Sequence, residues 1–165
     1  MPERKQLKVF DYMDKIEASL VTALLGGMTV VVFLQVFFRF VIKGSLPWSE
    51  ELARYFMVWA VFIGASIGAR EGAHIGVEAV VNFLPASLKK GATLIAGLLS
   101  VVFSILIMFL SFKVIAVLIK TGQKSPAMEI PMYWAYLAIP TGCILMGVRF
   151  FQATLEKLKA QKGEN

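Results

Sequence analysis

The stretch ASLVTALLGGMTVVVFLQVFF, residues 18–38, contains no charged side chain over 21 positions. A helix of this length rises about 30 Å, which matches the hydrocarbon core of a bilayer. Three later blocks are also long, apolar and almost free of charge. The sequence therefore predicts an all-α integral membrane protein, a single domain over residues 1–165 with four spans at about 18–38, 52–69, 91–112 and 130–149.

The composition agrees with a membrane protein and argues against other classes. Hydrophobic residues make up 58% of the chain and charged residues 17%, whereas soluble domains carry about 25% charged residues. The single cysteine, Cys143, allows neither an intrachain disulfide nor a cysteine-based metal site. The net charge of +6 comes without a basic segment long enough to be a nucleic-acid arm, so we expect no nucleic-acid partner.

The distribution of lysine and arginine predicts the orientation in the membrane. With four spans, both termini share a side with the loop between the second and third spans. Of the 17 basic residues, that side holds Arg4, Lys5, Lys8, Lys15, Arg70, Lys89, Lys90, Arg149, Lys157, Lys159 and Lys162. The other side holds Arg39, Lys43, Arg54, Lys113, Lys120 and Lys124. Because cytoplasmic loops are enriched in basic residues, we expect both termini in the cytoplasm.

Two short segments have the pattern of amphipathic helices. In residues 7–17 and 75–84, apolar side chains recur at i, i+3, i+4 and i+7 with polar residues on another face. Such stripes are typical of helices that lie in the headgroup plane. They also fit ordinary packing against neighbouring helices, and the pattern does not separate the two interpretations.

The segment LPWSEELARYF, residues 46–56, places charges at the start of the second span. Ser49 is the expected N-cap, and Glu50 and Glu51 then fall in the first turn, where carboxylates offset the helix dipole. Arg54 is close enough in helical register to pair with either glutamate. Trp48 suits the headgroup level. One interpretation is a self-neutralising helix start, and the other is that the second carboxylate contacts a partner.

Small residues and prolines mark further candidate packing sites. Ala60, Gly64 and Gly68 form a small-xxx-small pattern that allows another helix to approach closely. Pro131 is expected at a helix start. Pro140 removes a backbone hydrogen bond in the last span and is expected to kink it, with a hydroxyl or water satisfying the freed carbonyl.

No arrangement of residues indicates catalysis or a cofactor. His74 is the only histidine, which excludes bis-histidine haem ligation, and we interpret it as an interfacial polar residue. No nucleophile and base stand in a plausible catalytic pattern. All Asp and Glu residues lie outside the uncharged cores of the spans, whereas an autonomous proton-driven exporter needs a carboxylate in the membrane. The chain is therefore not expected to be an enzyme or a self-sufficient transporter.

Two long strings of residues resemble a known family. They are WSEELARYFMVWAVFIGASIGAREGAHIGVE, residues 48–78, and SPAMEIPMYWAYLAIPTGCILMGVRF, residues 125–150. The paired glutamates and arginine before W-x-x-F-x-G-A, then R-x-x-x-H, I-P-M, I-P-x-G and M-x-x-R, are similar to the small membrane subunit of tripartite ATP-independent periplasmic (TRAP) transporters, the DctQ-like family. The candidate interface or structural residues are Trp48, Glu50, Glu51, Arg54, Trp59, Gly64, Gly68, Arg70, His74, Pro131, Pro140 and Arg149.

The resemblance implies a subunit in the bacterial inner membrane. Its expected partners are a large multi-span TRAP subunit that moves substrate by a sodium-driven elevator motion, a periplasmic substrate-binding protein and membrane lipids. The small subunit would scaffold the large one and help dock the binding protein, during uptake of an organic acid such as a C4-dicarboxylate or a sialic acid. Sodium coupling would reside in the large subunit, so no cofactor is expected in this chain. The alternatives are an autonomous four-helix exporter and a membrane assembly protein without a transport role.

Overall fold

The computed structural model describes residues 2–71 and 86–163, with side-chain detail over 12–69, 88–89 and 91–156. The described chain is helical apart from its connections. The helices are α1 (Pro2–Phe37), the π-helical turn η1 (Phe38–Ile42), α2 (Pro47–Glu71), α4 (Ala86–Thr121), α5 (Tyr133–Tyr136) and α6 (Ala138–Gly163).

Four of these helical segments are long and apolar enough to cross a membrane: Tyr12–Ile42, Pro47–Ala69, Gly91–Thr121 and Tyr133–Glu156. The prediction of an all-α protein with four spans is confirmed. Each helical segment runs beyond the predicted span at one end or both, because a helix does not end where its uncharged core ends, while the last begins at Tyr133 rather than near residue 130. The 36 residues of α1, for example, correspond to a length of about 54 Å.

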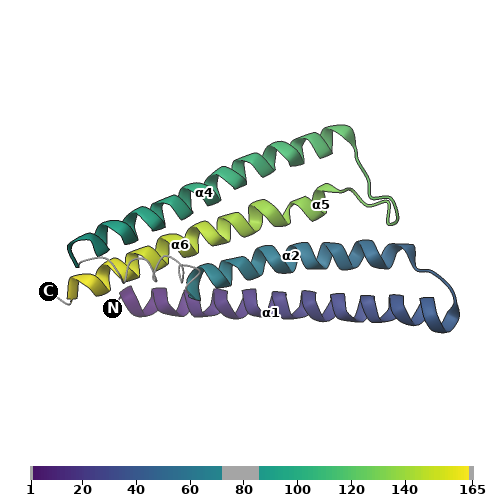
Figure 1. Cartoon of the computed structure of the whole chain (residues 1–165), viewed down its shortest axis with the longest axis horizontal. Helices are drawn as coiled ribbons and strands as arrows, with labels where there is room; N and C mark the ends of the chain where they lie inside the picture. Colours follow the sequence, from purple (N-terminus) through teal and green to yellow (C-terminus); the bar gives the residue numbers. More distant parts are fainter. Residues whose placement is uncertain (1, 72–85, 164–165) are drawn as a thin grey trace.

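The four long helices lie in a single row, in the order α1, α2, α6, α4 (Figure 1). α2 packs against α1 on one side and α6 on the other, and α4 packs against α6, while the backbones of α1 and α4 do not meet. α1 and α2 are antiparallel, as are α4 and α6, whereas the neighbours α2 and α6 run parallel, and both terminal helices have their free ends at one end of the molecule (Figure 1). We call this the terminal end, and the opposite end, with the connections 43–46 and 122–132, the loop end.

A row of helices leaves much of its surface open. The accessible surface is 11407 Å² for 18.2 kDa, whereas a soluble monomer of this mass exposes about 8,100 Å². Large apolar side chains such as Phe33, Phe40 and Leu98 are more than 60% exposed. This surface fits contact with acyl chains or with another membrane protein.

Small residues set the closest approaches between helices. A Cβ added at Gly142 would lie 2.6 Å from the Phe62 Cβ and 2.7 Å from the Phe62 carbonyl oxygen, so the backbones of α6 and α2 nearly touch there. At Gly27, an added Cβ would lie 3.1 Å from the Phe56 ring, which packs α1 on α2. Gly97 of α4 faces Thr154 of α6 even more closely. Each neighbouring pair in the row therefore has one such contact.

Two local expectations differ from the structure. Residues 7–17 do not form a separate helix but are early turns of α1, continuous with the first span. Ser49 is not the N-cap of α2: the helix begins at Pro47, and the Ser49 hydroxyl donates to the Leu46 carbonyl at 2.7 Å. Proline suits the first helical position because its fixed φ is already helical and its missing N–H has no partner there. Segment 75–84 lies outside the described residues.

Candidate functional site

One face of α2 carries four of the predicted site residues and is not covered by the rest of the described chain. Residues 50, 54, 57, 61, 64 and 68 fall within a narrow sector at about 100° per residue. We call them the α2 stripe: Glu50, Arg54, Met57, Val61, Gly64 and Gly68. Met57 and Val61 are more than half exposed, and a Cβ added at Gly64 or Gly68 would meet nothing within 4 Å. The small-residue pattern is therefore not used for packing among the described helices at these two positions.

The loop-end part of the α2 stripe is an ion pair. Arg54 Nη2 lies 3.1 Å from Glu50 Oε1, one helical turn away, and both side chains are about 70% exposed. Arg54 thus selects Glu50 rather than Glu51. Trp48, at the start of the helix, is 38% exposed, as expected for an aromatic ring at headgroup level.

Glu51 has a different role from its neighbour. Its Oε1 accepts a hydrogen bond from the Tyr55 hydroxyl at 2.8 Å, and its Oε2 accepts the backbone N–H groups of Ala127 and Met128, each at 3.1 Å. The loop 122–132 is thereby tied to α2, 76 residues away in sequence. Both carboxylate oxygens are used within the chain, so Glu51 positions the loop rather than standing free for a partner.

The aromatic and proline candidates join α2 to the last span. Trp59 Nε1 donates to the Trp134 carbonyl at 3.2 Å, which links α2 to α5. Pro131 precedes α5 by two residues, and its carbonyl accepts the Trp134 N–H at 3.3 Å. The interruption expected from Pro140 takes the form of a boundary at Leu137 between α5 and α6, with Pro140 in the first turn of α6. The Thr141 hydroxyl donates to the Leu137 carbonyl at 2.7 Å, and this carbonyl also accepts the Thr141 N–H at 3.3 Å, whereas the carbonyl that Pro140 leaves without its helical N–H is that of Tyr136.

Arg149 lies at the centre of a buried polar cluster nearer the terminal end. Its side chain is 1% exposed, and its Nη2 lies 2.5 Å from Asp14 Oδ1 and 3.1 Å from Glu17 Oε1. Glu17 is itself buried, and its Oε2 accepts a hydrogen bond from Ser66 at 2.9 Å. The four residues come from α1, α2 and α6. Through them, α6 is joined to α1, although the backbones of these two helices are separated by α2.

The sequence predicts a structural role for Arg149 but does not identify its partners. Asp14 and Glu17 are among the polar residues of the amphipathic segment 7–17, and no pattern distinguishes Ser66. A signal was available: Arg149 and the N-terminal acids were assigned to the same side of the membrane, and Asp14 and Glu17 are one turn apart on a helix. A cation closing the last span needs a counter-ion at its own depth, and Asp14 and Glu17, just before the first span, are two carboxylates on that side of the membrane.

The side chains of two predicted site residues lie outside the part of the chain that the structure describes. Arg70 belongs to α2 but its side chain is not among those described, and His74 lies outside the described residues. Among the residues that the structure describes, no group of three or more His, Cys, Asp and Glu side chains could hold a metal ion.

Comparison with known proteins gives these features a family. Residues 28–160 match the family described as "Tripartite ATP-independent periplasmic transporters, DctQ component". This range includes α2, α4, α5 and nearly all of α6.

Several relatives carry related names. The chain is 27% identical to the C4-dicarboxylate TRAP transporter small permease protein DctQ of Vibrio cholerae, over 88% of this chain and 72% of that protein. It is 28% identical to the sialic acid TRAP transporter permease protein SiaT of Haemophilus influenzae, over 92% of this chain but 24% of the relative. It is 23% identical to the ectoine TRAP transporter small permease protein TeaB of Halomonas elongata, over 90% of this chain and 77% of that protein.

A transporter permease subunit is not an enzyme class, and four spans make the chain a multi-pass membrane protein. The chain belongs to the DctQ family, the small permease components of TRAP transporters.

Proposed function

We propose that this chain is the small subunit of a sodium-driven, binding-protein-dependent uptake system for an organic acid in a bacterial inner membrane. Both termini face the cytoplasm, and the loop end faces the periplasm. The large subunit binds the substrate and sodium and carries out the elevator motion, while this chain braces it.

The observation that carries the proposal is the open row of helices with the uncovered α2 stripe. In a closed bundle, α2 would be shielded by its neighbours, whereas here Glu50, Arg54, Gly64 and Gly68 face outward. Exposed charges at the edge of a span are costly in lipid, and small residues favour close helix contact. A helix of the large subunit lying along this stripe would meet both features together.

The relatives support a role that does not depend on one substrate. Their names refer to C4-dicarboxylates, sialic acid, isethionate and ectoine, although each is similar to this chain over most of its length. A segment shared by systems with such different substrates fits a brace better than a substrate site. The match to a quarter of the sialic acid permease also fits a unit that works beside a larger membrane segment.

The loop end is the proposed contact for the periplasmic binding protein. Glu51 ties the loop 122–132 to α2 through two backbone N–H groups, which holds the loop in a defined position. The exposed side chains of Lys43 and Lys124 lie in the connections of the same end, and that of Arg39 lies in η1 just before the first of them. A positioned loop costs less entropy on docking than a free one.

The test is co-purification with the large subunit from native membranes in mild detergent. Gly64→Leu/Gly68→Leu is expected to lower recovery of the large subunit by about tenfold or more, since side chains at these positions would hold a packed helix away. Gly26→Leu is the matched control, because Gly26 is also a helical glycine with nothing within 4 Å of an added Cβ. Recovery of the chain without any larger partner, together with substrate flux from this chain alone in liposomes, would instead favour an autonomous exporter.

A further inference from the structure

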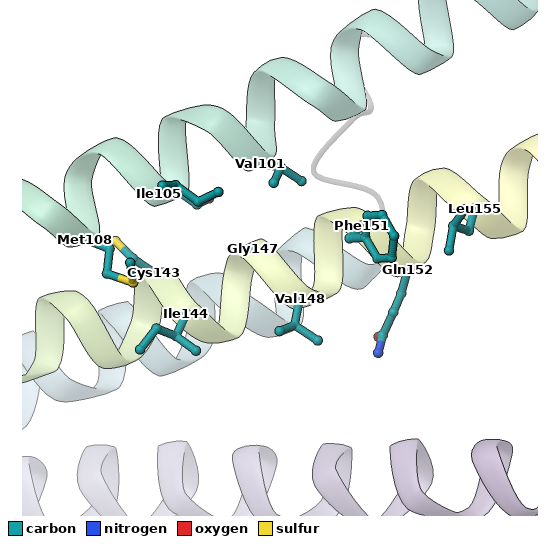
Figure 2. A pocket seen from close by; sticks show the side chains of 11 residues that line it. Val101, Ile105, Met108, Cys143, Ile144, Gly147, Val148, Phe151, Gln152 and Leu155 are labelled. Carbon is teal, nitrogen blue, oxygen red and sulfur yellow. The ribbon is translucent and has the colours of Figure 1, made fainter.

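Two of the cavities in the described chain differ in the chemistry of their walls. The larger, about 530 Å³, lies between α4 and α6, and Figure 2 shows Val101 and Ile105 on α4 with Val148 and Phe151 on α6. No charged side chain lines this cavity, so its walls do not select one occupant. The smaller, about 360 Å³, lies at the loop end, where the chain turns from η1 into α2. We call it the α1–α2 pocket.

The walls of the α1–α2 pocket are mostly polar. Its lining consists of Gln35 of α1, Arg39 of η1, Ser45 and Leu46 of the connection, and Pro47 and Glu50 of α2. A guanidinium carries five N–H donors, and the Gln35 amide and Ser45 hydroxyl add three more. The pocket therefore presents a cation together with several hydrogen-bond donors, which favours an anionic group as its occupant.

The Arg39 guanidinium has no counter-ion in the part of the chain that the structure describes. The Glu50 carboxylate pairs with Arg54, whose Nη2 lies 3.1 Å from Glu50 Oε1. Glu51, the next acid, has both oxygens bonded within the chain. Of the described side chains, none forms a hydrogen bond or ion pair with Arg39 or Gln35. Arg39, Glu50 and Arg54 together carry one positive charge in excess, so one further carboxylate would neutralise the group.

The pocket extends into the membrane-spanning part of the chain. Arg39 is the first charged residue after the uncharged stretch 18–38, and Gln35 lies four positions, about 6 Å, further into that stretch. Both belong to the span Tyr12–Ile42. A guanidinium at this depth is costly without a counter-ion, because water is scarce there. A soluble protein meets only groups outside the span, so the occupant of the pocket belongs to the membrane.

Continuity with the α2 stripe favours a protein side chain as the occupant. Glu50 lines the pocket and is also the loop-end member of the stripe. A helix that lies along the stripe therefore passes the pocket, and it takes the place of lipid beside Glu50. The frame of the pocket is fixed in advance, because the hairpin is closed by the Gly44 N–H, which donates to the Phe38 carbonyl at 3.1 Å. A preformed pocket loses little entropy when a side chain enters it.

We propose that the α1–α2 pocket receives an aspartate or glutamate side chain from a membrane helix of the large subunit, which pairs with Arg39 and accepts a hydrogen bond from Gln35. The guanidinium can form two parallel N–H···O bonds with a carboxylate, which fixes the height of that helix along the α2 stripe. The inference rests on the proposed function and names the chemistry of one contact within it. Lys43 and Lys124 then remain as the basic residues of the connections at the loop end.

The test is recovery of the large subunit with the whole chain from native membranes in mild detergent. Arg39→Gln is expected to lower recovery by about tenfold or more, since it removes one partner of a desolvated charge pair. Arg39→Lys should lower it less, by about threefold, because an ammonium keeps the charge but lacks the planar fork. The circular dichroism of both variants should match that of the original chain, because Arg39 has no polar contact among the described residues.

Charge reversal provides a sharper version with a matched control. Arg39→Glu should abolish recovery, whereas Lys120→Glu, the same reversal at an exposed position of α4 near the loop end, should leave it unchanged. In the Arg39→Glu chain, each Asp and Glu in the membrane helices of the large subunit is then replaced in turn by Arg. One replacement is expected to restore most of the recovery, because the exchanged charges form the same pair with opposite polarity.

Two outcomes would overturn the inference and leave the proposed function standing. One is unchanged recovery in Arg39→Gln and Arg39→Glu while Gly64→Leu/Gly68→Leu lowers it. The other is a loss of recovery that no exchange restores. A phospholipid bound to the original chain and absent from Arg39→Gln in native mass spectrometry would then assign the pocket to a lipid headgroup. Absence of any larger partner with the original chain would overturn the inference and the proposed function together.

Discussion

Two charged clusters contact α2, and their surroundings are opposite. Near the loop end, Glu50 and Arg54 form a pair with about 70% of each side chain exposed. Nearer the terminal end, Arg149 is 1% exposed and contacts Glu17, which is 5% exposed, and Asp14, which is 27% exposed. The first pair spans one helical turn, and the Arg149–Glu17 pair joins residues 132 positions apart.

The difference shows that the contribution of an ion pair to stability depends on its burial. An exposed pair at i and i+4 contributes about 0.3–0.5 kcal/mol, since water and salt weaken the attraction and two long side chains lose freedom. A buried pair adds little over apolar packing, but removing one partner leaves a charge without compensation and costs about 3–5 kcal/mol. The buried cluster is therefore a condition of folding, whereas the exposed pair is available for another protein.

The largest effect is expected for Arg149→Met. We predict a loss of about 3–5 kcal/mol in the free energy of unfolding, because Glu17 and Asp14 keep their positions without a cation. Urea unfolding in detergent, followed by circular dichroism, measures it. The triple variant Arg149→Met/Glu17→Gln/Asp14→Asn should recover most of the loss. Wild-type stability in the single variant would show that the cluster does not hold α6 to α1.

The second prediction concerns the loop tied by Glu51. Glu51→Ala removes the acceptor of two backbone N–H groups and of the Tyr55 hydroxyl, with an expected cost of about 1.5–3 kcal/mol. The loop should be cleaved faster by trypsin at Lys124. The neighbouring Glu50→Ala is the control and should leave cleavage unchanged. Equal cleavage in the two variants would mean that the loop is held by its own backbone bonds.

A smaller effect is predicted for Ser66→Ala. The Ser66 hydroxyl is within hydrogen-bond distance of Glu17 Oε2 and of the Ile63 carbonyl, and losing it should cost about 1 kcal/mol. Ser100→Ala is a matched control, because the Ser100 hydroxyl donates to the Ala96 carbonyl of its own helix. The same unfolding measurement compares them. If Ser66→Ala and Ser100→Ala lowered the free energy of unfolding equally, the bond from Ser66 to Glu17 would add nothing to stability, and only the charged residues of the cluster would contribute.

The smallest effect on stability is predicted for Arg54→Ala, at most about 0.5 kcal/mol, and smaller still at high salt. Co-purification of the large subunit should fall clearly in the same variant, while Lys113→Ala on α4 leaves it unchanged. If Arg54→Ala lowers co-purification while the free energy of unfolding hardly changes, the exposed pair is a contact with the large subunit. If Arg54→Ala lowered stability as much as Arg149→Met, the contrast between the two clusters would disappear.

The sequence predicts the fold well because the membrane imposes a simple rule. Apolar runs of about 20 residues are long enough to span the bilayer, and each of the four runs coincides with a helical segment that is long and apolar enough to do so. The Glu50–Arg54 pair is local, so helical periodicity alone is enough to predict it.

Contacts that depend on how helices are arranged in space could not be predicted in this way. Glu51 bonds backbone N–H groups, which any residue supplies, so no residue type indicates its role. The closest glycine contacts are at Gly97 and Gly142 rather than at Gly64 or Gly68, because spacing identifies a small face without indicating which helix lies against it. The partners of Arg149 required knowledge that α1 and α6 reach the same depth on two sides of α2.

The distance in sequence between Glu17 and Arg149 has a consequence for biosynthesis. Ribosomes add about 5–20 residues per second, so Glu17 is made roughly 7–26 seconds before its counter-ion, which is 132 residues later. During this interval the α1–α2 hairpin must persist with an unmatched carboxylate, most easily beside the protein-conducting channel or in contact with water. Closure of the ion pair then coincides with insertion of the final helix, so that a truncated or stalled chain differs from a finished one by an open acidic site at the membrane boundary. Quality-control proteases that recognise polar groups in membrane segments would distinguish the unfinished chain by its unpaired carboxylate.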